Sequence, residues 1–175
     1  MYELFWDEPY KIERVTFVPV GKNLYAEIDA EDWEKAKEHK WYLLRKKNGD
    51  TYAQMFTYPG GKQKATTLHR FILDLGDSKL QGDHINHCGL DNRKSNLRVV
   101  SHTQNLQNQR PRRSGKYSSY KGVCRAREKW EARICVFKKK VRLGVFETEI
   151  EAAQAYNEAA IKYFGDFACL NEIKI

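Results

Sequence analysis

Residues 82–105 read GDHINHCGLDNRKSNLRVVSHTQN, and this stretch limits the possible folds more than any other part of the chain. GDHI predicts a short strand, the polar segment after it predicts a loop, and LRVV predicts a second strand. Ser101 and Gln104 have the spacing of a capping box, which predicts that a helix begins there. Strand, loop, strand and helix over so short a span bring the first strand beside the helix. We therefore expect Asp83 and Asn105 to face one cleft.

The residues of that cleft have the chemistry of a phosphodiester-cleaving site. Asp83 and Asn105 supply the hard oxygen ligands that suit Mg²⁺. His84 follows Asp83 directly, and an imidazole with a pKa near neutrality can take a proton from water. Phosphodiester hydrolysis needs such a base together with a cation. The alternatives are an Asp83 ion pair with Arg93 or Arg98, and a His84 that only packs in the core.

The stretch resembles the HNH nuclease motif in the form found in phage-type homing endonucleases, DHIN…LDNR.SNLR.V…QN. The resemblance implies that His84 is the general base and that Asp83 and Asn105 bind Mg²⁺ or Mn²⁺. It also implies that Asn96 orients the base or the scissile phosphate. Asn105 stands where the motif usually has a third His, as in the homing-nickase branch.

Three neighbouring side chains have a second interpretation. Asn92 and Asn96 are also typical of turns in which the side chain bonds its own backbone, and for Asn92 we favour that interpretation. His69 lies in a segment that this family often places beside the site. His69 could contact DNA or support the cleft, and the sequence favours neither role.

The positive charge is concentrated further along the chain. Residues 110–144 contain 13 Lys and Arg against 2 Asp and Glu, whereas the net charge of the whole chain is +8. A concentrated basic segment indicates a polyanionic partner, most simply nucleic acid. Arg110, Arg112 and Arg113 precede the predicted strands. They could lie along a phosphate backbone or in the minor groove, or belong to a solvated tether.

Residues 120–164 predict three strands followed by one helix. The three runs are YKGVCRAR, KWEARICVF and KKKVRLGVF, and Thr148 with Glu151 forms a capping box before the helix. Alternation predicts one face toward the helix and one outward face. The inward set is Trp130, Ala132, Ile134, Val136, Val141, Leu143 and Val145, and the outward set is Lys129, Glu131, Arg133, Cys135, Lys140 and Arg142. A sheet with a cationic outer face suits a duplex groove.

Residues 120–171 resemble the Apetala-two/ethylene-response-factor DNA-binding domain through Y.GV, KW.A.I and V.LG.F.T..EAA.AY..AA. The resemblance implies DNA contacts from Lys121, Arg125, Arg127, Arg133, Lys140 and Arg142. Cys124 and Cys135 stand where plant members commonly have Arg, and Arg142 where they often have Trp. The docking mode can therefore be carried over, but the base preference cannot. The alternative is a basic face that contacts only solvent.

The first part of the chain predicts a β-rich scaffold. Residues 15–20 and 23–28 predict strands, and Asp29 predicts a helix to about residue 40. Asn48-Gly49 predicts the turn of a hairpin within residues 41–56, and residues 68–75 have helical spacing. Possible DNA contacts in this part are Lys46, Lys47, Lys62 and Lys64.

Taken together, the sequence predicts an α+β protein in four segments. These are a scaffold at 1–66, a ββα-metal nuclease motif at 67–108, a basic linker at 109–119, and a three-stranded antiparallel sheet packed on one helix at 120–175. No CxxC pair is present, so no structural zinc is expected. No apolar run is long enough for a membrane span. We expect a cytoplasmic protein, a monomer or weak dimer, that acts on double-stranded DNA.

The predicted function is that of a metal-dependent, site-specific endonuclease of the homing type that nicks DNA. A single site per chain favours a nick, because a double-strand break needs a dimer or a second event. The alternative function is that of a sequence-specific DNA-binding regulator with an inactive nuclease cleft.

Overall fold

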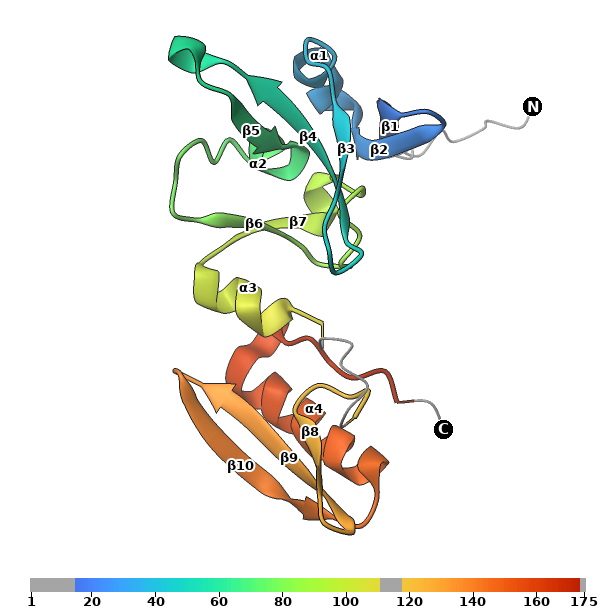
Figure 1. The fold of residues 1–175 in the computed structure, drawn as a ribbon, viewed down its shortest axis with the longest axis vertical. Helices are drawn as coiled ribbons and strands as arrows, with labels where there is room; N and C mark the ends of the chain where they lie inside the picture. The colour runs from blue at the N-terminus through green and yellow to red at the C-terminus, as the bar shows by residue number, and fades with distance from the viewer. Residues whose placement is uncertain (1–14, 111–117, 174–175) are drawn as a thin grey trace, which may run out of the picture. The chain divides into compact units, whose positions relative to one another are not determined.

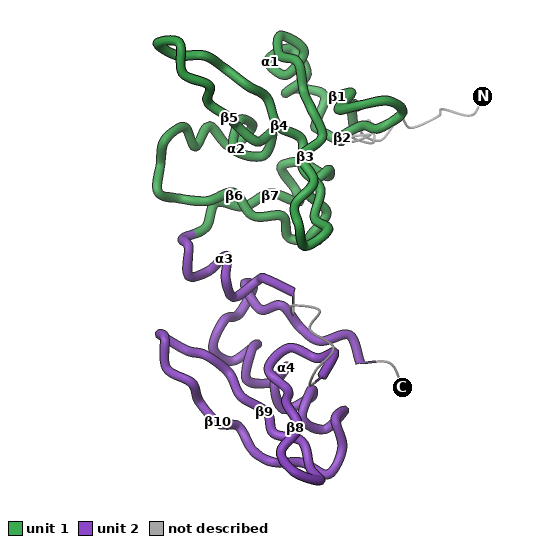
Figure 2. Tube along the Cα trace, in the orientation of Figure 1, with its two compact units in different colours: residues 1–100 green, residues 101–175 purple. Residues whose placement is uncertain are grey.

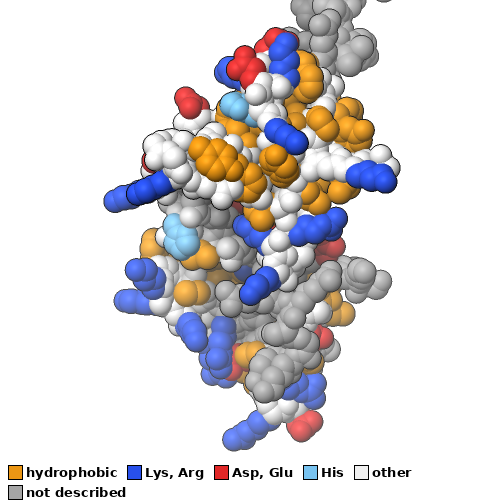
Figure 3. All heavy atoms as spheres, turned by 45° about the horizontal axis from the view of Figure 1, so that its top comes forward, with side chains coloured by type: hydrophobic (Ala, Val, Ile, Leu, Met, Phe, Trp, Pro, Cys, Tyr) orange, Lys and Arg blue, Asp and Glu red, His pale blue; other side chains and the backbone are white. Residues whose placement is uncertain are grey.

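The structure, a computed structural model, describes residues 15–110 and 118–173. The chain folds as two compact units, residues 1–100 and residues 101–175 (Figure 2). Among the described residues, one hydrophobic core lies in the first unit, and two clusters of buried residues lie in the second. The described helices include none that is long and apolar enough to cross a membrane. On the face drawn in Figure 3, hydrophobic side chains are exposed in the upper part, with Lys and Arg side chains beside them.

The first unit is built from antiparallel strands joined by short helices (Figure 1). Its strands are β1 (Val15–Gly21) paired with β2 (Leu24–Asp29), β3 (Tyr42–Arg45), β4 (Thr51–Thr57) and β5 (Lys64–Thr67) in that order, and β6 (Gln81–His84) paired with β7 (Leu97–Val100). Its helices are η1 (Ala30–Asp32), α1 (Trp33–Ala36), η2 (Pro59–Gly61), α2 (Leu68–Ile72) and η3 (Lys94–Asn96). The predicted strands at 15–28 and the hairpin around Asn48-Gly49 are confirmed.

The helix predicted after Asp29 is shorter than expected. Helix α1 ends at Ala36, and Asp29 makes no side-chain capping bond. Its Oδ2 atom instead accepts a hydrogen bond from the backbone N–H of Lys94, 2.7 Å away. The Asp29 carboxylate, which the local spacing predicted to cap a helix, thus binds Lys94, a residue distant in the sequence.

One core joins the predicted scaffold to the first part of the predicted nuclease motif. Its buried members are Val18, Val20, Ala26, Ile28, Ala36, Trp41, Ala53, Met55 and Leu68. Phe71, Ile72 and Leu90 pack against the same cluster. Helix α2 and the loop after β6 therefore complete the core of the preceding strands.

The second unit contains α3 (His102–Asn108), a sheet in the order β10-β9-β8, and α4 (Glu149–Phe164) followed by η4 (Gly165–Phe167). The sheet strands are β8 (Val123–Ala126), β9 (Lys129–Val136) and β10 (Lys139–Phe146), all antiparallel. Both predicted capping boxes are present, at Ser101–Gln104 and at Thr148–Glu151. The apolar sheet face packs on α4, as predicted.

A β-bulge in β10 places Val145 on the opposite face of the sheet from the one predicted. The register shifts between Arg142 and Gly144, so that Val145 lies opposite Glu131. Val145 is consequently exposed, although alternation predicted that it would face the helix. Phe146 takes the inward position against α4. One extra residue in a strand reverses the face of every side chain after it.

Candidate active site

The β6–β7 hairpin holds Asp83 on its first strand and Arg98 on its second. Asp83 lies directly opposite Arg98 in the antiparallel register. Oδ2 of Asp83 accepts hydrogen bonds from Nε of Arg98 and pairs with Nη2, each at 2.9 Å. Asp83 is buried, so the guanidinium offsets the cost of keeping a carboxylate out of water. The ion pair proposed as the alternative for Asp83 is therefore present with Arg98.

His84 is buried and hydrogen-bonded through Nε2. This atom lies 3.2 Å from Oδ1 of Asn92, an atom that can only accept. In the neutral ring Nε2 therefore carries the proton, and Nδ1 carries the lone pair. Burial lowers the pKa of His84, while Asn92 and the nearby Asp83 and Asp91 act in the opposite direction. The ring is thus held neutral at pH 7, the form that a general base needs.

Two further rings surround His84. The rings of His69 and His84 meet edge to face with centroids 4.8 Å apart, and the Tyr52 ring lies 5.9 Å from His84 and 5.8 Å from His69. Nε2 of His69 lies 3.1 Å from Oγ1 of Thr67. Burial lowers the pKa of His69 to about 3. His69 is 9% exposed, and a side chain this buried favours support of His84 over direct contact with DNA.

Two glycines permit this close packing. A Cβ atom on Gly82 would lie 2.6 Å from Cδ2 of His69, and one on Gly89 would lie 2.2 Å from the carbonyl oxygen of Thr51. The second position is also 2.7 Å from the Tyr52 ring. The backbone after β6 therefore approaches β4 more closely than any other residue type would allow. Neither glycine was singled out from the sequence.

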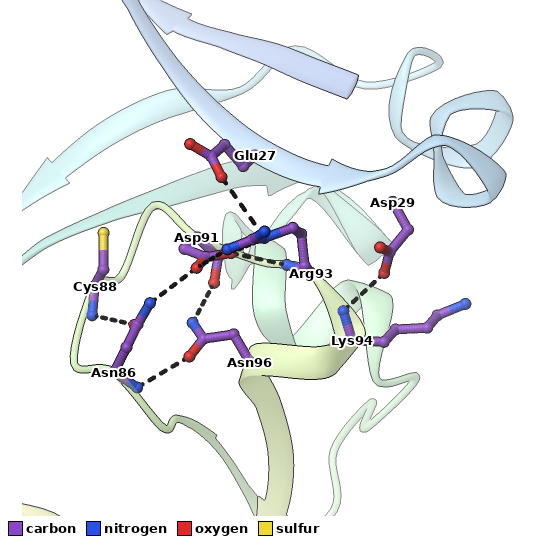
Figure 4. A network of polar contacts seen from close by, with 8 residues as sticks. All are labelled: Glu27, Asp29, Asn86, Cys88, Asp91, Arg93, Lys94 and Asn96. Atoms are coloured by element: carbon purple, nitrogen blue, oxygen red, sulfur yellow. Dashed lines mark hydrogen bonds and ion pairs between the residues drawn. The ribbon is translucent and has the colours of Figure 1, made fainter. Parts of the chain in front are cut away.

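Asn96 ties the two ends of the loop between β6 and β7 together (Figure 4). Its Oδ1 atom accepts from the backbone N–H of Asn86 at 2.9 Å, and its Nδ2 atom donates to the carbonyl of Asp91 at 2.8 Å. The Asp91 carboxylate in turn accepts from Asn86 and from Arg93, each at 2.8 Å. The hydrogen bond from Arg93 holds the pKa of Asp91 below its usual value.

The same loop is attached to β2. The backbone N–H of Glu27 donates to Leu90, and that of Asn92 donates to Glu27, each at 2.8 Å. The guanidinium of Arg93 lies 3.6 Å from the Glu27 carboxylate (Figure 4). These bonds fix Asn92, and through it the ring of His84, against a strand of the predicted scaffold.

Asn92 corrects one interpretation of the sequence. It is fully buried, and its side chain faces His84 rather than closing a turn on its own backbone. Asp91 and Tyr52 were also missed as neighbours of the site. The motif LDNR contains Asp91 and Asn92, but no spacing rule shows which of its polar side chains faces the histidine.

Asn105, the second predicted metal ligand, lies on α3 in the second unit. Its backbone N–H donates to the carbonyl of Ser101 at 3.0 Å, within the capped first turn of the helix. Among the residues described, no group of three or more His, Cys, Asp or Glu side chains could hold a metal ion. A carboxylate and an amide oxygen are nevertheless ligand types that Mg²⁺ accepts when water and phosphate complete its shell.

The outer face of the second unit's sheet presents cationic side chains around one carboxylate. Arg133 and Arg142 lie opposite each other on β9 and β10 and are exposed. Nη2 of Arg133 donates to Oε2 of Glu131 at 2.9 Å, and Nε of Arg142 lies 3.2 Å from Oε1. Glu131 is on the predicted outward face but is only 6% exposed beneath these two guanidiniums. The carboxylate thereby fixes where both arginines point.

The remaining predicted DNA contacts have varied surroundings. Lys140 and Arg127 are exposed, and the Arg125 guanidinium lies 5.0 Å from the Trp130 ring centroid. Lys121 precedes β8 and is half-buried, with its ammonium bonded to the carbonyls of Gln107 and Gln109. Arg110 is exposed. Arg112 and Arg113 lie outside the described residues.

Comparison with known proteins identifies relatives of the chain. The chain is 32% identical to an uncharacterized HNH endonuclease of Acanthamoeba polyphaga mimivirus over 177 residues, which are 95% of this chain and 87% of the relative. It is 49% identical over 45 residues to APETALA2-like protein 2 of Oryza sativa, in both the indica and japonica subspecies. That match covers 25% of this chain and 10% of each rice protein. No protein-family model matches the chain.

The similarity to the viral protein extends over almost the whole chain. It therefore includes the β6–β7 hairpin with Asp83 and His84, the loop held by Asn96, and the helix that carries Asn105. With the buried and neutral His84 in place, this similarity shows that the chain belongs to the HNH endonuclease family.

Proposed function

We propose that this protein is a metal-dependent, site-specific DNA endonuclease of the homing type, with His84 as its general base. The observation that carries the proposal is the buried imidazole whose Nε2 donates to Asn92. The bond leaves Nδ1 as the basic nitrogen, and burial disfavours the charged form of the ring. The similarity to a viral HNH endonuclease supports nuclease chemistry and a DNA substrate.

The reaction we propose is the attack of water on the phosphorus atom of the scissile phosphate. Nδ1 of His84 accepts the proton of that water, an O–P bond forms, and the bond from phosphorus to the 3′-oxygen breaks. Solvent water gives the leaving 3′-oxygen the proton that makes it a hydroxyl. The products carry a 5′-phosphate and a 3′-hydroxyl. General-base catalysis of this kind contributes about 10²–10⁴-fold to a rate.

Residues around His84 hold this base in place. Asn96 fixes the loop that carries Asn92 through its bonds to Asn86 and Asp91. His69 and Tyr52 support the ring of His84 from its sides. We propose that Asn96 acts on the reaction through this loop and that His69 acts through His84.

Asp83 and Asn105 are the residues that we propose as ligands of Mg²⁺ or Mn²⁺. Both supply oxygen, the donor atom that these cations prefer. When bound, the cation would supply positive charge to the scissile phosphate and the leaving oxygen. A monomer with one such site per chain would nick one strand, and a double-strand break would need a dimer or a second event.

Recognition of the target is proposed for the sheet of the second unit. Exposed Arg133, Lys140 and Arg142 share its outer face, and strands with such side chains can enter a major groove. The short similarity to the rice APETALA2-like proteins supports this assignment. Arg110, Arg112 and Arg113 precede the sheet in the chain, where they could contact phosphates.

The test is the nicking of supercoiled plasmid. The binding site is first selected from random duplexes, then cloned, and the plasmid is incubated with Mg²⁺ or with EDTA. We expect open circles with Mg²⁺ only, and none with His84→Ala. Cleavage by His84→Ala at the rate of the unsubstituted protein would overturn the assignment of the base.

One observation favours the second candidate, a DNA-binding regulator with an inactive cleft. The guanidinium of Arg98 occupies Oδ2 of Asp83, the carboxylate proposed to bind metal. Specific binding to the selected site without cleavage in either Mg²⁺ or Mn²⁺ would establish this candidate. Restoration of cleavage by Arg98→Met would then show that the ion pair blocks the metal site.

A further inference from the structure

Lys121 is placed differently from Arg133 and Arg142, two other predicted DNA contacts of the second unit. Its Nζ atom donates to the carbonyls of Gln107 and Gln109, each at 2.6 Å, where helix α3 ends. The exposed Arg133 and Arg142 instead have their side chains on the outer face of the sheet. Burial lowers the pKa of Lys121, which agrees with an ammonium enclosed by protein. The half-buried Lys121 thus contacts a helix where the resemblance implied that it contacts DNA.

A chain of hydrogen bonds anchors Lys121 to helix α4. The backbone N–H of Lys121 donates to Oδ1 of Asn171 at 2.6 Å, and Nδ2 of Asn171 donates to the backbone carbonyl of Lys121 at 3.1 Å. The backbone of Asn171 is bonded in both directions to the side chain of Asn157 on α4, at 2.7 and 3.0 Å. Asn171 is only 9% exposed. The position of the Lys121 backbone is therefore fixed by the core of the second unit.

Helix α3 is too short to be stable by itself. It has only seven residues, and isolated helices shorter than about 12 residues are marginal in water. Its first turn is satisfied by the capping box of Ser101 and Gln104. The last carbonyls of a helix have no partner within it, and a lysine at that end bonds them and complements the helix dipole. Lys121 supplies this cation from outside the helix.

We propose that Lys121 is a positioning residue for the nuclease reaction, because it fixes α3, the helix that carries Asn105, to the unit that binds DNA. The inference rests on the proposed function, in which Asn105 is a metal ligand. Its consequence is that a residue of the nuclease motif depends structurally on the DNA-binding unit. The DNA-binding unit then does more than find the target, since it also holds one ligand of the catalytic metal.

The test compares three Lys→Met substitutions in the full chain. Lys121→Met removes the bonds to α3, Lys140→Met removes an exposed cation of the sheet face, and Lys162→Met removes an exposed lysine of α4. Each variant is measured for DNA affinity against salt, for nicking rate at saturating DNA against Mg²⁺ concentration, and for amide hydrogen exchange in residues 102–108.

We expect Lys121→Met to raise the Mg²⁺ concentration for half-maximal nicking by about tenfold, as for residues that hold a metal ligand in place. Exchange in residues 102–108 should become faster, while DNA affinity and its salt dependence stay unchanged. Lys121→Arg should restore most of the Mg²⁺ response. Lys140→Met should lower affinity and reduce the salt slope by about one, with the Mg²⁺ response kept. Lys162→Met should match the unsubstituted protein throughout.

A reduced salt slope in Lys121→Met, with an unchanged Mg²⁺ response and unchanged exchange, would make Lys121 a phosphate contact and overturn the inference. Failure of the proposed function has a different signature, because the unsubstituted protein would then bind its site without nicking in Mg²⁺. In that case faster exchange in Lys121→Met would still support the docking of α3, and unchanged exchange would still refute it. If Lys121→Met does not fold, Lys121→Gln replaces it in the same measurements.

Discussion

The amide oxygen of Asn92 lies 3.2 Å from Nε2 of His84, and this contact fixes the proton of the proposed general base on the nitrogen that faces the protein. Asn92 is fully buried and is itself bonded through its backbone to Glu27 of β2. The orientation of the imidazole thus depends on a strand far away in the sequence. A second group that orients a catalytic histidine is a common requirement of such sites.

Replacement of Asn92 should lower the rate of the chemical step. In Asn92→Ala the imidazole loses the acceptor that selects its tautomer, so we expect the nicking rate at saturating DNA to fall about tenfold or more. DNA affinity should not change, because Asn92 is buried within the first unit. Single-turnover nicking and binding are measured together. A rate within twofold of the unsubstituted protein would show that the contact with His84 has no catalytic role.

His69 should make the stability of the protein depend on pH. Its pKa is about 3 when folded, against 6.5 when unfolded, because burial disfavours the charged ring. Below about pH 6.5 the unfolded state therefore binds one more proton than the folded state. The free energy of unfolding should fall with decreasing pH, by about 1.4 kcal/mol per pH unit for this group.

The measurement is urea unfolding between pH 7 and pH 4.5, with His69→Gln as the reference. The variant lacks the titrating ring. As the pH decreases, its free energy of unfolding should therefore fall by about 1.4 kcal/mol less per pH unit than that of the unsubstituted protein. Parallel curves for the two proteins would mean that His69 is protonated in the folded state and that its surroundings differ from those described.

Gly89→Ala should destabilise the first unit. The added Cβ would lie 2.2 Å from the backbone oxygen of Thr51, which cannot move without the strand β4. Overpacking of this kind costs about 1–3 kcal/mol. Gly21→Ala is the matched control, because nothing lies within 4 Å of its added Cβ. Unfolding midpoints of the two variants should differ clearly, and equal midpoints would contradict the close approach of the loop to β4.

Loss of the sheet-face arginines should affect binding rather than catalysis. Arg133→Ala and Arg142→Ala are each expected to weaken DNA affinity, and to reduce the salt slope by about one if the contact is to phosphate. The Mg²⁺ response of nicking at saturating DNA should not change. Glu131→Gln should weaken binding less than either, since it frees both guanidiniums without removing charge from them. Unchanged affinity in both arginine variants would remove the sheet from the DNA interface.

Local sequence determined much of the secondary structure. Both capping boxes formed where Ser101–Gln104 and Thr148–Glu151 predicted them, because each needs only residues three positions apart. The three strands and the helix after residue 120 also followed from alternation and helical spacing. These signals depend on neighbours along the chain, so they are readable without the fold.

The motif also revealed the residue types of the site before their contacts were known. Asp83 next to His84, with Asn96 and Asn105 at family spacings, was sufficient to predict nuclease chemistry, and the viral relative supports that chemistry. The sequence could not show that Asn92 faces His84, that His69 and Tyr52 enclose it, or that Asp83 pairs with Arg98. The contacts of His84 join elements whose distance is set by the packing of a shared core, and the Asp83–Arg98 pair depends on the register of the β6–β7 hairpin.

Tertiary structure alone decided where the side chains of Val145 and Lys121 point. Val145 turned outward because a bulge shifted the register of β10, and no property of valine signals a bulge two residues earlier. Lys121 turned toward α3 because the helix end offered it unpaired carbonyls at the place where Asn171 fixes its backbone. A side chain's residue type and charge are properties of the sequence, but the partner that it meets depends on which elements the core brings within a few ångströms of it.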